Sequence, residues 1–137
     1  MTVLDLSAEA LAKIDPNPRR SHTLPGSFYY DPAIFAHERE AIFARTWQLA
    51  GHVSRLAGPG DYITAEVVGE SVIVLRGRAG ELRAFYNVCQ HRGNRLKHEN
   101  CGFTSNITCG FHLWSWNLDG TISDIPESHD FPQRSEE

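Results

Sequence analysis

The spacing of hydrophobic and polar residues divides the chain into a short helical part and a longer part rich in strands. Asp31 followed by Pro32 is typical of a helix start, because the carboxylate caps free amides and proline suits the first helical position. Apolar residues then recur at helical spacing through about residue 45. They are Ile34, Phe35, Ala41, Ile42 and Phe43. A shorter helix is expected at residues 7–14, before the prolines at 16 and 18.

From Trp47 onwards the pattern changes to short β-type runs separated by turns rich in glycine. The β-branched and aromatic residues of these runs are expected to fill one or both faces of a small sandwich or barrel. The expected strands are residues 47–50, 61–67, 71–76, 81–87, 106–108, 114–117 and 121–122. We therefore predict a mainly β, antiparallel domain at residues 46–131, preceded by an arm and helix at 1–45 and followed by a polar tail at 132–137.

Two short segments of this domain each carry one cysteine and one histidine. The first holds Cys89 and His91, the second holds Cys109 and His112, and seventeen residues separate them. Zinc fingers instead pair two cysteines on one segment and two histidines on another. Mixed pairs suit a [2Fe–2S] cluster in which both cysteines bind one iron and both histidines bind the other, the arrangement of Rieske centres. These four residues are the predicted cofactor and metal ligands, and no catalytic residue is predicted.

The ligand set predicts an electron-transfer site. Two ferric ions and two sulfides carry a charge of about +2, so two thiolates bring the oxidised cluster to about zero, where four thiolates would give about −2. Adding an electron to a neutral centre requires less electrostatic work than adding it to a dianion. Imidazole ligation therefore raises the reduction potential into the range of roughly −150 to +300 mV.

The chain resembles the alpha subunits of ring-hydroxylating (Rieske non-haem iron) oxygenases. The resemblance rests on Cys-Gln-His-Arg-Gly from Cys89 and on Thr-Cys-Gly-Phe-His-x-Trp from Thr108 to Trp114, and extends over about residues 24–131. It implies a Rieske-type antiparallel β-sandwich. The sequence departs from the family at Leu113, where glycine or alanine is usual, and at Phe111 and Trp116, which replace tyrosines.

In that family the cluster takes electrons from a ferredoxin or flavin reductase and passes them to a mononuclear iron, usually in the adjacent subunit of a trimer. That iron is held by two histidines and a carboxylate in a C-terminal domain. The other histidines here are scattered, so we expect this half to lie outside the chain and the chain alone not to hydroxylate a substrate. The alternatives are a free-standing Rieske ferredoxin and, more remotely, a zinc-stabilised binding module.

Respiratory Rieske proteins supply hydroxyl donors to sulfur from a serine and a tyrosine two and four residues after the second histidine. Those places hold Trp114 and Trp116 here, so we predict a potential in the lower part of the Rieske range. Trp114 is expected to shield the cluster. Arg92 is expected either to present its positive charge to a partner or neighbouring subunit or to form a salt bridge within its loop. No metal role is expected for Cys101 or His98.

Composition narrows the choice of partners and compartment. The net charge of −4 and the pI near 5.9 argue against nucleic acid or an anionic membrane as partner, because both attract clustered lysine and arginine. The first residues lack a basic segment followed by an apolar one, and no apolar run reaches the roughly 18 residues of a membrane span. We therefore expect a cytoplasmic protein.

Overall fold

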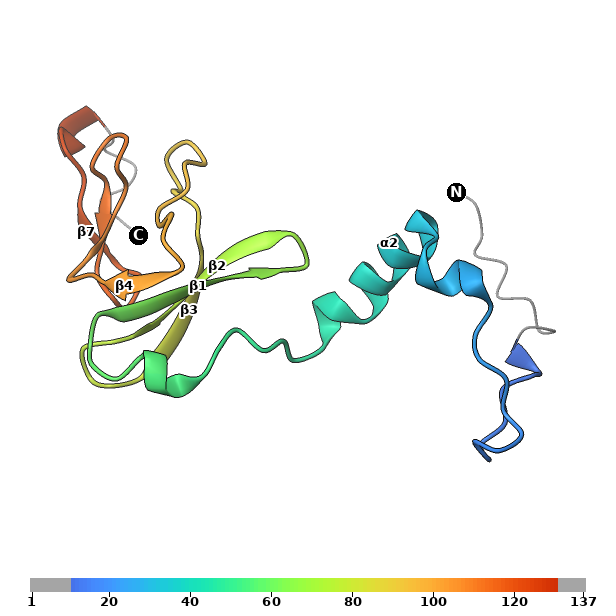
Figure 1. Ribbon diagram of the computed structural model, residues 1–137. Coiled ribbons are helices and arrows are strands. Elements are labelled where there is room, and N and C mark those ends of the chain that lie inside the picture. Colours follow the sequence, from blue (N-terminus) through green and yellow to red (C-terminus); the bar gives the residue numbers. More distant parts are fainter. Residues whose placement is uncertain (1–10, 131–137) are drawn as a thin grey trace. The chain divides into compact units, whose positions relative to one another are not determined.

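The computed structural model describes residues 11–130 and divides after Trp47 into two units, Met1–Trp47 and Gln48–Glu137 (Figure 1). The first unit is built around the α-helix α2, Pro32–Ala41. The short 3-10 helices η1, Gly26–Tyr29, and η2, Phe43–Arg45, flank it. Residues 7–10 of the helix expected at residues 7–14 lie outside the described residues; Leu11 is helical and a turn follows it.

The start of α2 follows the prediction. The side chain of Asp31 accepts a hydrogen bond of 2.8 Å from the amide of Ala33, and Pro32 occupies the first helical position. The apolar stripe is less buried than its spacing suggests, because Ile34 is 8% exposed whereas Phe35 is 57% exposed.

The second unit consists of two antiparallel sheets, which confirms the prediction of a mainly antiparallel β fold. A four-stranded sheet has the order β3-β2-β1-β4, and a three-stranded sheet has the order β5-β6-β7. The strands are β1 Asp61–Val67, β2 Glu70–Arg76, β3 Leu82–Tyr86, β4 Cys101–Phe103, β5 Ile107–Thr108, β6 Ser115–Trp116 and β7 Ile122–Asp124. The 3-10 helices are η3, Val53–Arg55, and η4, Ser128–Asp130.

The strand predicted at residues 47–50 is wrong. That segment has no strand conformation, and Trp47 and Leu49 are almost fully exposed. A run of alternating residues forms a strand only where a neighbouring edge accepts its hydrogen bonds, and the edge of β1 is occupied by β4, with Ile63 opposite Cys101. Strand β4 was not predicted.

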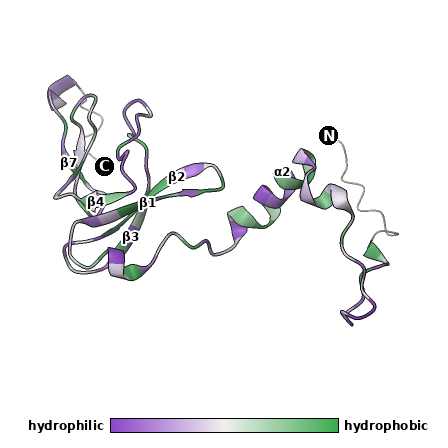
Figure 2. Cartoon of the chain, viewed as in Figure 1, coloured by the Kyte–Doolittle hydropathy of each residue, from purple (hydrophilic) through white to green (hydrophobic). Residues whose placement is uncertain are grey.

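The core of the second unit joins the two sheets through large apolar side chains and both candidate cysteines. Its most buried aliphatic residues, Ile73 and Leu75, alternate along β2 and have no exposed surface. The cluster consists of Tyr62, Ile73, Leu75, Cys89, Ile107, Cys109, Trp114, Trp116 and Leu118. In Figure 2 the segment that follows β3 is coloured hydrophilic, in contrast to the greener strands. Within residues 11–130, no helix is both long enough and apolar enough to span a bilayer.

Candidate metal centre

The first ligand loop, residues 89–94, is closed by two main-chain hydrogen bonds. The amide of Cys89 donates to the carbonyl oxygen of Asn94 at 2.7 Å, and the amide of Gly93 donates back to the carbonyl oxygen of Cys89 at 2.9 Å. Gly93, four residues after the cysteine, has a φ of +72°, a left-handed conformation that glycine adopts without steric cost. The chain therefore reverses direction around the thiol.

The second ligand loop, residues 109–114, has the same design. The amide of Cys109 donates to the carbonyl oxygen of Trp114 at 2.9 Å, and the amide of Leu113 donates to the carbonyl oxygen of Cys109 at 3.1 Å. Leu113 again lies four residues after the cysteine and has a φ of +62°. This equivalence explains why glycine is expected at position 113: the loop needs a left-handed residue there, and this chain places a leucine in that conformation.

The loops bring the two thiols together inside the domain. Cys89 is 2% exposed and Cys109 is 1% exposed; neither is in a disulfide, and their side chains are hydrogen-bonded to each other. The Sγ of Cys89 also accepts hydrogen bonds from the main-chain amides of His91 and Arg92. A nest of N–H donors around a buried sulfur is the setting that stabilises a thiolate.

The two thiols differ in acidity. Burial raises the pKa of the Cys89 thiol, and its hydrogen bond to Cys109 raises it further. Burial also acts to raise the pKa of Cys109, but donation from the amides of Phe111 and His112 and from the Cys89 thiol outweighs burial, so the net shift is downward.

The two histidines lie side by side at the less buried side of the site. Their ring centroids are 4.8 Å apart, and both residues are half-buried. Trp114, 3% exposed, stacks on His91 with a centroid distance of 4.6 Å and an interplanar angle of 5°. The ring of Phe111 lies 4.0 Å from that of His112. Trp114 thus covers one face of the His91 ring, and its shielding of a cluster stays a prediction.

This donor set fits a cluster of two irons better than a single ion. Within residues 11–130, no three His, Cys, Asp or Glu side chains converge as the ligands of one metal ion would. A Rieske-type [2Fe–2S] cluster is instead bound by two thiolates on one iron and two imidazoles on the other. The site offers a buried pair of thiols and a pair of imidazoles, which are the two kinds of ligand that such a cluster needs.

A buried asparagine that was not predicted from the sequence braces the first ligand loop. Asn87 is 3% exposed, and its Oδ1 accepts from the amides of Leu96 at 3.2 Å and Lys97 at 2.8 Å. Its Nδ2 donates to the carbonyl oxygen of Lys97 at 2.7 Å and to Ser71 Oγ at 3.2 Å. The returning chain is thereby fastened to β2.

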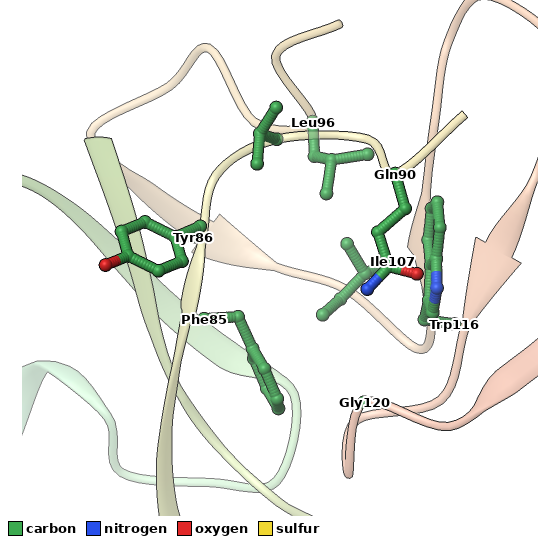
Figure 3. Close-up of a pocket in the computed structure, with 8 residues that line it drawn as sticks. Phe85, Tyr86, Gln90, Leu96, Ile107, Trp116 and Gly120 are labelled. Atoms are coloured by element: carbon green, nitrogen blue, oxygen red, sulfur yellow. The ribbon is translucent and has the colours of Figure 1, made fainter. Parts of the chain in front are cut away.

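Gln90, the residue between Cys89 and His91, lines a pocket that none of the four candidate ligands lines. The pocket has a volume of about 390 Å³ and lies at the base of the first ligand loop. Figure 3 shows Gln90 beside Trp116, with Phe85 and Tyr86 on the β3 side. The lining residues are Phe85, Tyr86, Val88, Gln90, Leu96, Ile107, Trp116 and Gly120.

The side chains of the remaining candidates are exposed. Cys101 is exposed on β4, opposite Ile63 of β1. His98 and Arg92 are exposed.

The chain matches the family model of the Rieske [2Fe-2S] domain over residues 46–134. It is 45% identical over 107 residues to the carnitine monooxygenase oxygenase subunit of Escherichia coli strain K12, covering 78% of this chain and 29% of that protein. It is 41% identical over 96 residues to the large oxygenase component of a naphthalene 1,2-dioxygenase system from Pseudomonas aeruginosa, covering 70% and 21%. The chain therefore spans less than a third of these relatives.

Comparison with solved structures finds the same class of protein. A quaternary ammonium Rieske monooxygenase, described for carnitine oxidation and inter-subunit electron transfer, superposes with a TM-score of 0.76 at 43% identity, covering 80% of this chain and 30% of that one. Naphthalene 1,2-dioxygenase with bound indole superposes with a TM-score of 0.73 at 37% identity, covering 79% and 24%. The expected Rieske-type fold is thereby confirmed.

Proposed function

The chain belongs to the Rieske [2Fe-2S] domain family, and on that premise we propose that Cys89, His91, Cys109 and His112 hold its cluster. Members of this family bind a [2Fe–2S] cluster, which supplies a one-electron couple when bound. One observation carries the assignment: two loops of identical backbone design present a hydrogen-bonded pair of buried thiols and a pair of imidazoles 4.8 Å apart.

The surrounding residues give each end of the site a different task. The thiol end is closed off by the core, where main-chain amides directed at the sulfurs stabilise thiolate ligands. The imidazole end is the more accessible one, so electrons enter and leave past His91 and His112. Trp114 holds the plane of His91 through stacking and keeps water from that face.

We also propose that the domain serves an oxygenase alpha subunit. The relatives are mono- and dioxygenase components, which are oxidoreductases, and this chain covers less than a third of each. On this proposal a ferredoxin or flavin reductase supplies electrons, and a mononuclear iron in a catalytic domain, in an adjacent subunit of a trimer, receives them. The inter-subunit electron transfer described for the related quaternary ammonium monooxygenase supports that route.

The proposed domain organisation keeps residues 46–131 as the cluster domain and residues 1–45 as an arm and helix. We also propose the cytoplasm as the compartment, as the sequence predicts. The low reduction potential expected from Trp114 and Trp116 remains a prediction.

Anaerobic titration with dithionite tests the function. The reddish-brown chain should take up one electron per molecule and develop a rhombic electron paramagnetic resonance (EPR) signal. With a reductase, oxygen and either L-carnitine or naphthalene, it should form no oxygenated product. A colourless protein would contradict the proposal that the chain binds a [2Fe–2S] cluster. Oxygen-dependent product from this chain alone would contradict the proposal that oxygenation requires a separate catalytic domain.

A further inference from the structure

Asn94 is bonded to both ligand loops. Its carbonyl oxygen accepts the amide of Cys89 at 2.7 Å, which closes the first loop. Its side-chain Nδ2 reaches across to the second loop and donates to Cys109 Sγ at 3.6 Å. The same Nδ2 donates to the carbonyl oxygen of Arg95 at 3.0 Å, so the carboxamide is held in the orientation that directs an N–H at the sulfur.

This bond makes the two cysteines unequal. Each thiol receives two main-chain amides from its own loop, because the loops share one design. The two thiols also share one hydrogen bond with each other, and Cys109 receives a further N–H from the side chain of Asn94. The extra donor depends on the identity of one side chain, so a substitution can remove it while both loop backbones are kept.

On the premise of the proposed function, the structure assigns to Asn94 the role of a positioning residue that raises the reduction potential of the cluster through Cys109 Sγ. One-electron reduction takes the cluster and its thiolates from a net charge of about zero to about −1. An N–H dipole aimed at a ligand sulfur stabilises the more negative state more strongly than the neutral one. The half-buried setting of Asn94 and the buried sulfur of Cys109 limit screening by water.

The hydrogen bond from Asn94 modifies the reduction potential expected from Trp114 and Trp116. Those positions lack hydroxyl donors, which alone predicts a low potential. Asn94 brings a side-chain donor to the same cluster from the opposite loop, and thereby offsets part of that loss.

Redox titration of the cluster-loaded protein tests this role with Asn94→Leu, a substitution of similar size that cannot donate. We expect the equilibrium constant for one-electron reduction to fall about tenfold, equivalent to about 59 mV. Asn117→Leu is the matched control, because Asn117 also donates through Nδ2, at 3.0 Å, but to Thr121 Oγ1 in the turn before β7. Its potential should equal that of the wild type. An unchanged potential in Asn94→Leu with a full cluster overturns the assignment.

A measurement on the wild type covers the case in which Asn94→Leu does not retain its cluster. Asparagine labelled with ¹⁵N in the side chain is incorporated, and pulsed EPR of the reduced protein records its coupling to the cluster spin. A coupling present in the wild type and in Asn117→Leu supports the bond, and its absence overturns it. A wild type without iron and sulfide would instead refute the proposed function, which distinguishes the two failures.

Discussion

Position 113 shows how a single dihedral angle explains a departure from the family sequence. Leu113 occupies the place that Gly93 occupies in the first ligand loop, with a φ of +62°, and its side chain is 60% exposed. An L-residue in this conformation costs about 1–2 kcal/mol relative to its preferred regions. Because the side chain is mostly exposed, its hydrophobic burial offsets little of this conformational cost.

Leu113→Gly is therefore expected to raise the free energy of unfolding by about 0.5–1 kcal/mol, since relief of the left-handed strain exceeds the extra chain entropy of glycine. Chemical denaturation of the two proteins measures the difference. Phe111→Gly is the control: Phe111 is 62% exposed in the same loop but does not have positive φ, so this change should destabilise. Equal destabilisation by both substitutions would show that position 113 carries no strain.

Among the site residues, the four proposed ligands were predicted from the sequence, and the structure brings the two thiols together and the two imidazoles together. The two asparagines bonded to the ligand loops and their neighbouring segment were not predicted. The Cys-x-His and Cys-x-x-His spacings are local and chemically distinctive. Asn87 and Asn94 act on partners up to 16 residues away along the chain, and an asparagine in a loop has many ordinary explanations. Three-dimensional proximity was needed to identify them.

Asn87→Ala is expected to lower the free energy of unfolding by about 2–4 kcal/mol, because it leaves the partly buried amides of Leu96 and Lys97 without their side-chain acceptor. Thermal or chemical denaturation gives the value. Asn106→Ala removes two exposed side-chain hydrogen bonds, one to Ser123 at 3.0 Å and one from Arg78 at 3.2 Å, and should cost less than about 1 kcal/mol. Similar costs for the two variants would rule out a bracing role for Asn87.

At the scale of elements, the central strands were predictable and the edges were not. The expected strands at residues 61–67, 71–76 and 81–87 agree with β1, β2 and β3 to within a residue or so, because alternation and glycine turns are local signals. Strand β4 has only three residues, all exposed, and exists through its pairing with β1. The false strand at residues 47–50 has the alternation but no partner.

The central strand β2 is expected to carry much of the stability of the four-stranded sheet. Ile73→Ala should reduce the free energy of unfolding by about 2–5 kcal/mol, because Ile73 is fully buried and the substitution leaves a cavity. Leu82→Ala on β3, where the side chain is 50% exposed, should cost less than about 1.5 kcal/mol. If urea denaturation gave equal losses, the core would not be centred on β2.

Tyr62 of β1 links the sheet to the segment that precedes β4 and should make stability depend on alkaline pH. It is 5% exposed and donates to Glu99 Oε2 at 3.4 Å. Burial, followed by the charge of Glu99, raises the pKa of Tyr62 above its ordinary value near 10. Its contribution to stability is therefore complete below pH 10 and lost as the pH rises through the folded-state pKa.

Free energies of unfolding measured from pH 8 to 12 for wild type and Tyr62→Phe test this dependence. The difference between the two proteins should be constant below about pH 10 and then shift in favour of Tyr62→Phe, which has no phenol to ionise. Parallel curves across the whole range would show that the phenol is not perturbed.

At the scale of the whole molecule, the second unit provides a rigid holder for one redox group. Two sheets share a core with both cysteines, and the two ligand loops rise from that core with the same hydrogen-bond design. The core and the loop hydrogen bonds thus hold the two thiols and the two imidazoles on a common framework. The family and the cluster type could be predicted from the sequence, because the ligand motif is contained in one domain.

The iron and acid-labile sulfide content of the purified protein tests the central claim most directly. We predict about two irons and two sulfides per chain, with loss of sulfide and visible absorption in His112→Ala. His98→Ala, which changes an exposed histidine outside the site, should retain both. A wild type without labile sulfide, or a His112→Ala variant with intact visible absorption, would contradict the account.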